Sequence, residues 1–192
     1  LSTAVDVAVG SDEAIYVVNK GTEYMPNTGV SKCTLDHKFV WDNRGFSFGA
    51  GPFPTSIALD KQENVYVSDD YVNKIFVLDK DGESLGYWPE MIPVPPLPHN
   101  PPGLDFSLYE AKLNGGMDGD GDLNGPSGLA FDKDENLHIV DSHNHRVQVF
   151  AKDGAFLRKF GSRGSGDGEM NLPWGIAIDD DSNIYVADWG ND

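Results

Sequence analysis

The sequence has a single cysteine, Cys33, and no apolar run that approaches the length of a membrane-spanning helix. One cysteine excludes an internal disulfide framework, and a transmembrane helix needs about 18 or more consecutive apolar residues. Basic residues are also scarce, since 14 Lys and Arg stand against 31 Asp and Glu, which gives a formal net charge of −17. Such a surface repels nucleic-acid phosphates. We therefore expect neither a nucleic-acid partner nor a membrane span.

The acidity has other readings, which stay open. It is compatible with affinity for divalent cations or with a salty environment, and more simply it keeps a protein soluble. The chain starts at Leu1 rather than at Met, so a signal peptide has either been removed or was never included. The compartment is not decided by this, and an extracytoplasmic or secreted location is slightly favoured over a cytoplasmic one.

Common catalytic signatures are missing as well. The sequence contains no G-x-S-x-G elbow, no H-E-x-x-H, no G-x-x-x-x-G-K-[ST] and no paired CxxC, which removes the main sequence support for several hydrolase and nucleotide-binding classes. Cys33 has no neighbouring His in a recognised arrangement, so we interpret it as a structural thiol. Glycine and proline are abundant, with 22 and 12 residues. They predict many turns and hence many strands.

Four segments align without gaps and reveal an internal repeat. Each has a short strand, a polar turn and a second strand in which aliphatic and aromatic residues alternate. The segments are VAVGSDEAIYV (7–17), IALDKQENVYV (57–67), LAFDKDENLHI (129–139) and IAIDDDSNIYV (176–186). Third strands are expected at 74–79 and 146–151, and fourth strands at 84–88 and 156–161. Four antiparallel strands per unit predict the blades of a β-propeller, with a solenoid of two-stranded units as the alternative.

We therefore expect one all-β propeller domain over residues 1–192 that covers about three and a half blades of a ring. The predicted parts are blade 1 (1–53), blade 2 (54–88) with a proline-rich insertion (89–124), blade 3 (125–172) and a partial blade 4 (173–192). In blade 1 the outer strands are expected near KCTLDHKFV (32–40) and FSFGAG (46–51). Because closure takes about four to eight blades, we interpret the domain as incomplete, with self-association into a ring as the alternative.

The repeat also resembles a known family. The pattern P-x-G-[IL]-A-x-D, then N-[IL]-Y-V-x-D, then N-x-R-[IV]-x-V-F is similar to the NHL repeat, and residues 126–150 match it almost throughout. This resemblance implies a six-bladed propeller that acts as a binding scaffold. YVVNKG (16–21) and VSDD (67–70) further resemble bacterial propellers similar to peptidyl-α-hydroxyglycine amidating lyase.

Members of that group with lyase activity carry metal-binding histidines in a P-H-G setting at the start of the blades. The matching positions here read PTS (54–56), PSG (126–128) and PWG (173–175). The resemblance therefore implies a non-catalytic propeller that binds a protein, a peptide or a small molecule. The alternative is a fragment of a metal-dependent lyase or hydrolase with Ca²⁺ or Zn²⁺ in the channel; no cofactor is identified from the residues themselves.

In a propeller, the loops from second to third strand and the connections between blades share one side, here called the loop face, where ligands usually bind. The candidate contact residues on it are Asp69, Asp70, Tyr71, Asp141, His143, His145, Arg146, Trp174, Asp188 and Trp189. The residues of DSHNHRV (141–147) have two readings. Asp141 and Arg146 have counterparts in the other repeats, which favours a structural pair, whereas the two histidines could contact a ligand or join a zinc site if a third ligand came from elsewhere.

Three further features have alternatives. Asp69 and Asp70 could hold Ca²⁺, although adjacent acids in a turn are more often solvated. MDGDGDLNG (117–125) looks like a calcium loop, but Leu129 stands where the bidentate Glu is required, so a linker similar to 165–173 is favoured. The proline-rich segment is either a lid or an exposed spacer; its candidate contact residues are Trp88, His99 and Tyr109.

Overall fold

The computed structural model describes residues 3–21, 28–36, 38–43, 53–88 and 118–191. In this part of the chain, antiparallel strands form three four-stranded sheets and one two-stranded sheet. The first sheet contains β1 (Thr3–Val9), β2 (Ile15–Lys20), β3 (Gly29–Cys33) and β4 (Phe39–Asn43). The second contains β5 (Pro54–Leu59), β6 (Val65–Asp69), β7 (Lys74–Leu78) and β8 (Ser84–Trp88).

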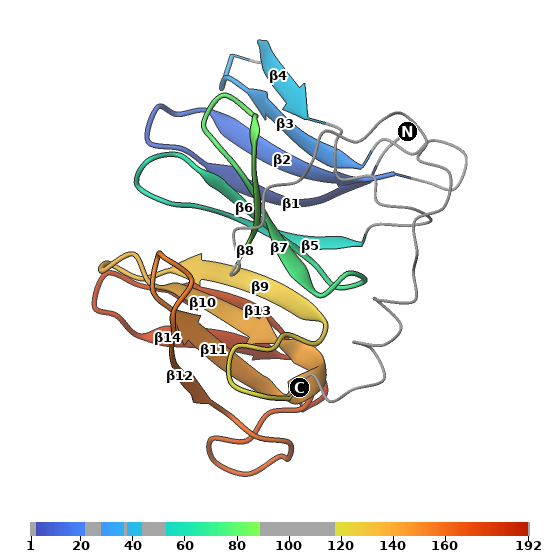
Figure 1. Cartoon of the computed structure of the whole chain (residues 1–192), viewed down its shortest axis with the longest axis vertical. Coiled ribbons are helices and arrows are strands. Elements are labelled where there is room, and N and C mark those ends of the chain that lie inside the picture. The colour runs from blue at the N-terminus through green and yellow to red at the C-terminus, as the bar shows by residue number, and fades with distance from the viewer. Residues whose placement is uncertain (1–2, 22–27, 37, 44–52, 89–117, 192) are drawn as a thin grey trace.

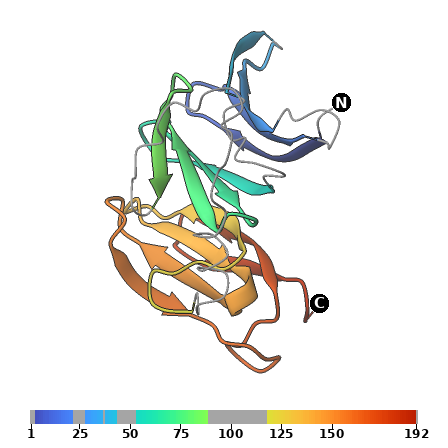
Figure 2. The same ribbon diagram turned by 45° about the vertical axis from the view of Figure 1, so that its right-hand side comes forward.

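The third sheet contains β9 (Pro126–Phe131), β10 (Leu137–Asp141), β11 (Arg146–Phe150) and β12 (Phe156–Phe160), with the short 3₁₀ turn η1 (Ser142–Asn144) between its middle strands. The two-stranded sheet pairs β13 (Pro173–Ile178) with β14 (Ile184–Asp188). The sheets follow one another in space in chain order, and β1, β5, β9 and β13 are successive neighbours (Figures 1 and 2). These are the blades of a β-propeller, numbered 1 to 4, and the predicted fold class is confirmed.

Blade 1 differs in detail from the prediction. Its third strand starts at Gly29, and its fourth strand is Phe39–Asn43, so KCTLDHKFV (32–40) spans the hairpin between them rather than one strand. FSFGAG (46–51) lies outside the described residues, as do most of the proline-rich insertion, His99 and Tyr109. Among the described residues, no helix has the length and apolarity to cross a bilayer.

A repeated aspartate turn closes the inner hairpins of blades 2, 3 and 4, whereas blade 1 has Gly10 at that position. In blade 3, Asp132 accepts hydrogen bonds from the backbone N–H of Asp134 (2.9 Å) and of Asn136 (2.8 Å). Glu135 between them has φ of 64°, a left-handed conformation that is uncommon for residues other than glycine. The side-chain acceptor of Asp132 satisfies turn donors that would otherwise face solvent or remain unpaired.

Apolar side chains fill the space between successive blades. One cluster joins blades 1 and 2, and a second joins blades 2 and 3. Trp88 packs edge-on against Phe150 at 4.8 Å between ring centroids, and its side chain is 1% exposed. Trp88 was predicted as a contact residue at the start of the proline-rich segment. That prediction is wrong, because the side chains of the inter-blade core cover Trp88.

Candidate functional site

The loop face is built from backbone contacts between two kinds of loop. In blade 3, the N–H of His143 donates to the carbonyl oxygen of Asn124 (3.1 Å), so the turn after β10 lies against the connection that enters the blade. Blade 4 repeats this contact, since the N–H of Gly190 donates to Asn171 (2.8 Å). Both kinds of loop therefore lie on one side of the propeller, as the sequence predicted.

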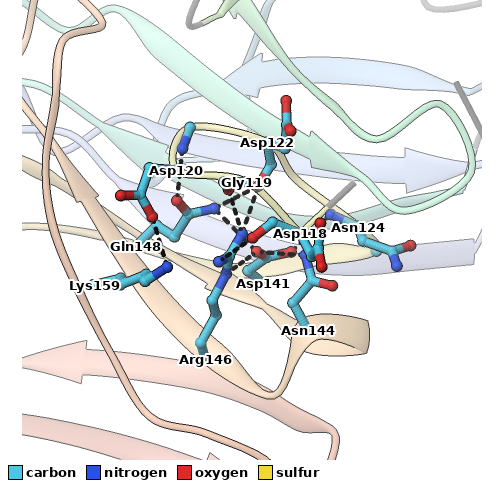
Figure 3. Close-up of polar contacts among 12 residues, drawn as sticks. Asp118, Gly119, Asp120, Asp122, Asn124, Asp141, Asn144, Arg146, Gln148 and Lys159 are labelled. Carbon is cyan, nitrogen blue, oxygen red and sulfur yellow. Dashed lines mark hydrogen bonds and ion pairs between the residues drawn. The ribbon is translucent and has the colours of Figure 1, made fainter. Parts of the chain in front are cut away.

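Arg146 is the centre of the largest polar network on this side (Figure 3). Its Nε donates to Asp141 Oδ2 at 2.6 Å, and its terminal nitrogens donate to the carbonyl oxygens of Asp118 (2.9 Å), Gly119 (2.8 Å) and Asp122 (3.1 Å). The guanidinium thus occupies the middle of the acidic segment whose sequence looks like a calcium loop. A charged group at this depth requires such partners, because burial without them would be costly.

Asp141 receives further donors, which fix the loop around it. Its Oδ1 accepts from the N–H of Asn124 (2.7 Å), and its Oδ2 also accepts from the side-chain amides of Asn144 (2.9 Å) and Gln148 (3.0 Å). Burial raises the pKa of Asp141, and these donors together with Arg146 oppose that shift. Both Asp141 and Arg146 are buried, so neither presents its charge at the surface of the loop face.

The equivalent aspartate of blade 2 has a different environment. Asp69 Oδ1 accepts from the N–H groups of Tyr71 (2.9 Å) and Val72 (3.1 Å), but its buried Oδ2 has no hydrogen-bond partner among the described residues. Val72 and Phe76 stand where blade 3 has its amide donors, Asn144 and Gln148. Burial is accordingly the first cause of the raised pKa of Asp69.

His145 has a structural role that the sequence did not indicate. Its Nδ1 accepts a hydrogen bond from the N–H of Leu172 (3.1 Å), just before β13. In blade 2, Asn73 Oδ1 accepts from the N–H of Gly125 (2.6 Å), just before β9. His145 and Asn73 have φ of 55° and 56°, and each joins its blade to the next one. Because Nδ1 accepts, the ring is neutral in this arrangement.

The surroundings of His145 keep it neutral. Burial lowers its pKa, and the nearby charges of Arg163 and His143 lower the pKa further. His143 differs, because its side chain is exposed and lies against Gly125. Gly125 has φ of 62°, and a Cβ there would come within 2.7 Å of His143 Nδ1. Of the two histidines, His143 is therefore the one that faces solvent.

Large aromatic side chains remain exposed on this side of the molecule. Tyr71, in the turn after β6, is 49% exposed; Trp189, in the turn after β14, is 72% exposed; and Trp174, near the start of β13, is 48% exposed. Asp70 and Asp188 are half-buried. Asp188 holds its own loop, because it accepts from the N–H of Asn171 (2.7 Å) and from the side chain of Asn191 (2.7 Å).

The positions that carry metal-binding histidines in the lyases hold other groups here. Thr55 bonds to Ser68 Oγ (2.9 Å) and to the carbonyl oxygen of Pro126 (2.9 Å). Ser127 is buried, with no side-chain partner among the described residues, and Trp174 follows one blade later. Hydroxyl and indole groups are not the ligands that zinc prefers, so these residues do not fit the metal site of the lyases. In the described part of the chain, no three His, Cys, Asp or Glu side chains are grouped as metal ligands.

Comparison with known proteins supports the propeller interpretation. Residues 123–192 match the family DUF5128, described as a 6-bladed beta-propeller. RING finger protein nhl-1 of Caenorhabditis elegans is 48% identical over 46 residues, which are 24% of this chain and 5% of that protein. Protein brain tumor of Drosophila melanogaster is 34% identical over 57 residues, 30% of this chain and 6% of that protein. The predicted resemblance to NHL-repeat propellers is confirmed.

Solved structures agree on the fold. A catalytically inactive virginiamycin B lyase from Staphylococcus aureus with quinupristin superposes with a TM-score of 0.61 at 15% identity, over 97% of this chain and 49% of that one. A nidogen/laminin complex gives 0.61 at 16% identity, over 97% and 57%. A protein of unknown function from Bacteroides thetaiotaomicron gives 0.64 at 16% identity, over 95% and 44%. The chain spans about half the length of these structures and a small part of the two proteins matched by sequence.

Proposed function

We propose that this chain is a non-catalytic NHL-type propeller that binds a protein, a peptide or a small ligand through its loop face. The observation that carries the proposal is the exposure of Tyr71 on that side, in blade 2, which has a described blade on either side of it. Tyrosine and tryptophan supply large contact areas and polar edges, and they are enriched at binding hot spots. The proposed contact residues are Tyr71, His143 and the half-buried Asp70, together with Trp174 and Trp189 of the last described strand pair.

The other predicted contact residues support the loops instead. Asp141 and Arg146 bind each other, His145 joins two blades, and the carboxylates of Asp69 and Asp188 accept backbone N–H groups. These side chains set the shape of the surface that carries the aromatic residues. A rigid support of this kind lowers the conformational cost of binding.

A protein or peptide is the partner class that we favour. The net charge of −17 favours positively charged partners and disfavours nucleic acid. Among the similar folds, nidogen is found in a complex with laminin, and the lyase is found with quinupristin. Those are statements about those proteins, and they motivate a binding test for this one.

The test uses a phage-displayed library of random peptides selected on the 192-residue chain. Peptides selected by the wild type should lose at least about tenfold in affinity for the variant Tyr71→Ala/Trp189→Ala, because each truncation removes a hot-spot aromatic. Leu35→Ala is the matched control, since Leu35 is 52% exposed in the β3–β4 turn on the opposite side. The proposal is contradicted if the selected peptides keep their wild-type affinity for Tyr71→Ala/Trp189→Ala and lose affinity for Leu35→Ala.

A metal-dependent lyase or hydrolase is the second candidate, and the fold likeness to virginiamycin B lyase motivates it. Elemental analysis of the purified chain after dialysis distinguishes the two functions. Zinc or calcium retained at one equivalent per chain would favour the enzyme. For the binding scaffold we expect substoichiometric metal, because Thr55, Ser127 and Trp174 occupy the positions of the metal histidines.

A further inference from the structure

The described lysines differ in how their ammonium groups are neutralised. Carboxylates lie within ion-pair distance of Lys32, Lys38, Lys80, Lys152 and Lys159. Lys20, the last residue of β2, has no such carboxylate in the described ranges of the chain. Its Nζ lies 3.3 Å from the ring centroid of Phe53, over the ring face that attracts cations. Because the ring carries no net charge, it orients the ammonium without neutralising it.

Lys20 and Phe53 form one surface with Tyr71, here called the blade 1–2 patch. The three residues come from the end of β2, the connection before β5 and the turn after β6, so all three lie on the loop face. The rings of Phe53 and Tyr71 are 6.1 Å apart between centroids, at 39° between their planes. They are 40% and 49% exposed. An ammonium therefore stands over one exposed ring, and a second exposed ring lies beside the first.

Backbone contacts hold the patch in place. The N–H of Asp70 donates to the carbonyl oxygen of Phe53 (3.1 Å), which joins the turn after β6 to the connection before β5. Asp69 Oδ1 accepts from the N–H of Tyr71 (2.9 Å). Blades 1 and 2 each have four described strands, and β2 contacts β5 where the two blades meet (Figure 1). The surface is thus preformed, which lowers the conformational cost of binding.

We propose that the blade 1–2 patch binds an extended peptide segment in which an aromatic residue and a Glu or Asp stand two positions apart. Side chains at i and i+2 of an extended segment point to the same side, about 6.6 Å apart. This spacing is close to the 6.1 Å between the rings of Phe53 and Tyr71. The aromatic side chain of the peptide packs on Tyr71, and its carboxylate accepts from the ammonium of Lys20 above Phe53.

An acidic contact segment is compatible with the net charge of −17. Charges in solution are largely screened beyond about 8 Å at physiological ionic strength. The charge of the whole chain therefore acts on the approach of a partner, whereas the groups in contact decide which segment fits. A partner that is basic overall can present one acidic segment to Lys20. This inference rests on the proposed loop-face function and names the chemistry of the segment that is bound there.

The first experiment selects phage-displayed random peptides separately on the wild type, on Lys20→Gln and on Lys20→Glu. The wild type should enrich Glu or Asp two positions from an aromatic residue. Lys20→Gln should lose this enrichment, and Lys20→Glu should enrich Lys or Arg in its place. Lys38→Gln is the matched control and should select as the wild type does, since Lys38 is 78% exposed just before β4 on the opposite side.

The second experiment measures the affinity of one peptide selected by the wild type and of its Glu→Gln form. The exchange should weaken binding to the wild type about fivefold, the size expected of a largely exposed ion pair. It should change little on Lys20→Gln, which already lacks the ammonium. Asp70→Asn should not weaken binding of the acidic peptide, because Asp70 places a second negative charge beside Tyr71.

The outcomes separate this inference from the function on which it rests. The inference is overturned if the selected peptides show no acidic enrichment, or if both Lys20 variants select the same peptides as the wild type. In that case the loop-face function stands if the peptides still lose affinity for Tyr71→Ala/Trp189→Ala. If the wild type selects no peptide, both proposals fail.

Discussion

Asp141→Asn is expected to destabilise the protein strongly, and the structure supplies a control at the equivalent position of the neighbouring blade. The substitution keeps an oxygen that can accept from Asn124, but it removes the negative charge 2.6 Å from Arg146 Nε. The side chains of Arg146 and Asp141 are 7% and 0% exposed. Removal of one partner from a buried pair costs about 3–5 kcal/mol, because the remaining charge loses its compensation.

The lower end of that range applies here, since Arg146 retains three carbonyl acceptors. We expect a loss of about 3 kcal/mol in the free energy of unfolding at pH 7. For a chain of this size, that corresponds to a fall in Tm of roughly 6–12 °C. Urea denaturation followed by tryptophan fluorescence measures the free energy, and calorimetry measures Tm.

Asp69→Asn is the matched control, because Asp69 Oδ2 is buried with no hydrogen-bond partner among the described residues. Burial is the first cause of the raised pKa of Asp69, as it is for Asp141, so the partner of Oδ2 distinguishes the two sites and the direction of the pKa shift does not. When the pKa of a carboxyl is higher in the folded state than its unfolded value near 3.9, the folded state loses stability as pH rises above about 4, because ionisation is less favourable in the folded state. Asp69→Asn should therefore be neutral or stabilising at pH 7. If it costs as much as Asp141→Asn, then the loop contacts of Oδ1 rather than the Arg146 pair explain the importance of this position.

Three other changes test the contacts between blades. His145→Asn should keep the hydrogen bond from the N–H of Leu172. The pKa of His145 is lower in the folded state than in the unfolded state, so protonation of His145 destabilises the folded wild type as pH falls below about 6.5, and the variant should lose less stability there. Urea unfolding midpoints from pH 5 to 8 measure this difference. Gly128→Ala should lower the free energy of unfolding by more than about 2 kcal/mol, because the added Cβ on β9 would lie 2.8 Å from the backbone of β13 in the next blade. Gly175→Ala should cost far less, since the nearest atom to its added Cβ is 3.5 Å away. Thermal unfolding of the two variants compares these costs. Glu63→Ala should raise the rate of amide hydrogen exchange in the β1–β2 turn, because Glu63 accepts a hydrogen bond from the N–H of Ser11 at 2.7 Å. An unchanged exchange rate in that turn would contradict the contact.

The equivalence of Asp141 with Asp69 and Asp188 could be read from the repeat, but the partners of each carboxylate could not. The pairing of Asp141 with Arg146 joins residues five apart and was predicted correctly. The carbonyl oxygens that complete the site come from residues 118, 119 and 122, more than twenty positions earlier. Gln148 was not recognised as part of it; the one available signal was that blade 2 has Phe76 at the same place in an otherwise similar strand.

The strands, turns and blade type were determined by the sequence itself, because alternating side chains and turn residues act over a few positions; the strand alternation recurs in every repeat and the aspartate turn in three of the four. Contacts between blades were decided only by the tertiary structure. The closeness of Gly128 to β13, the bond from Leu172 to His145 and the burial of Trp88 all arise where two separately formed sheets meet. Their partners lie 27 to 62 residues away in the chain. No local pattern encodes such distances, since only the packing of blade on blade brings those atoms together.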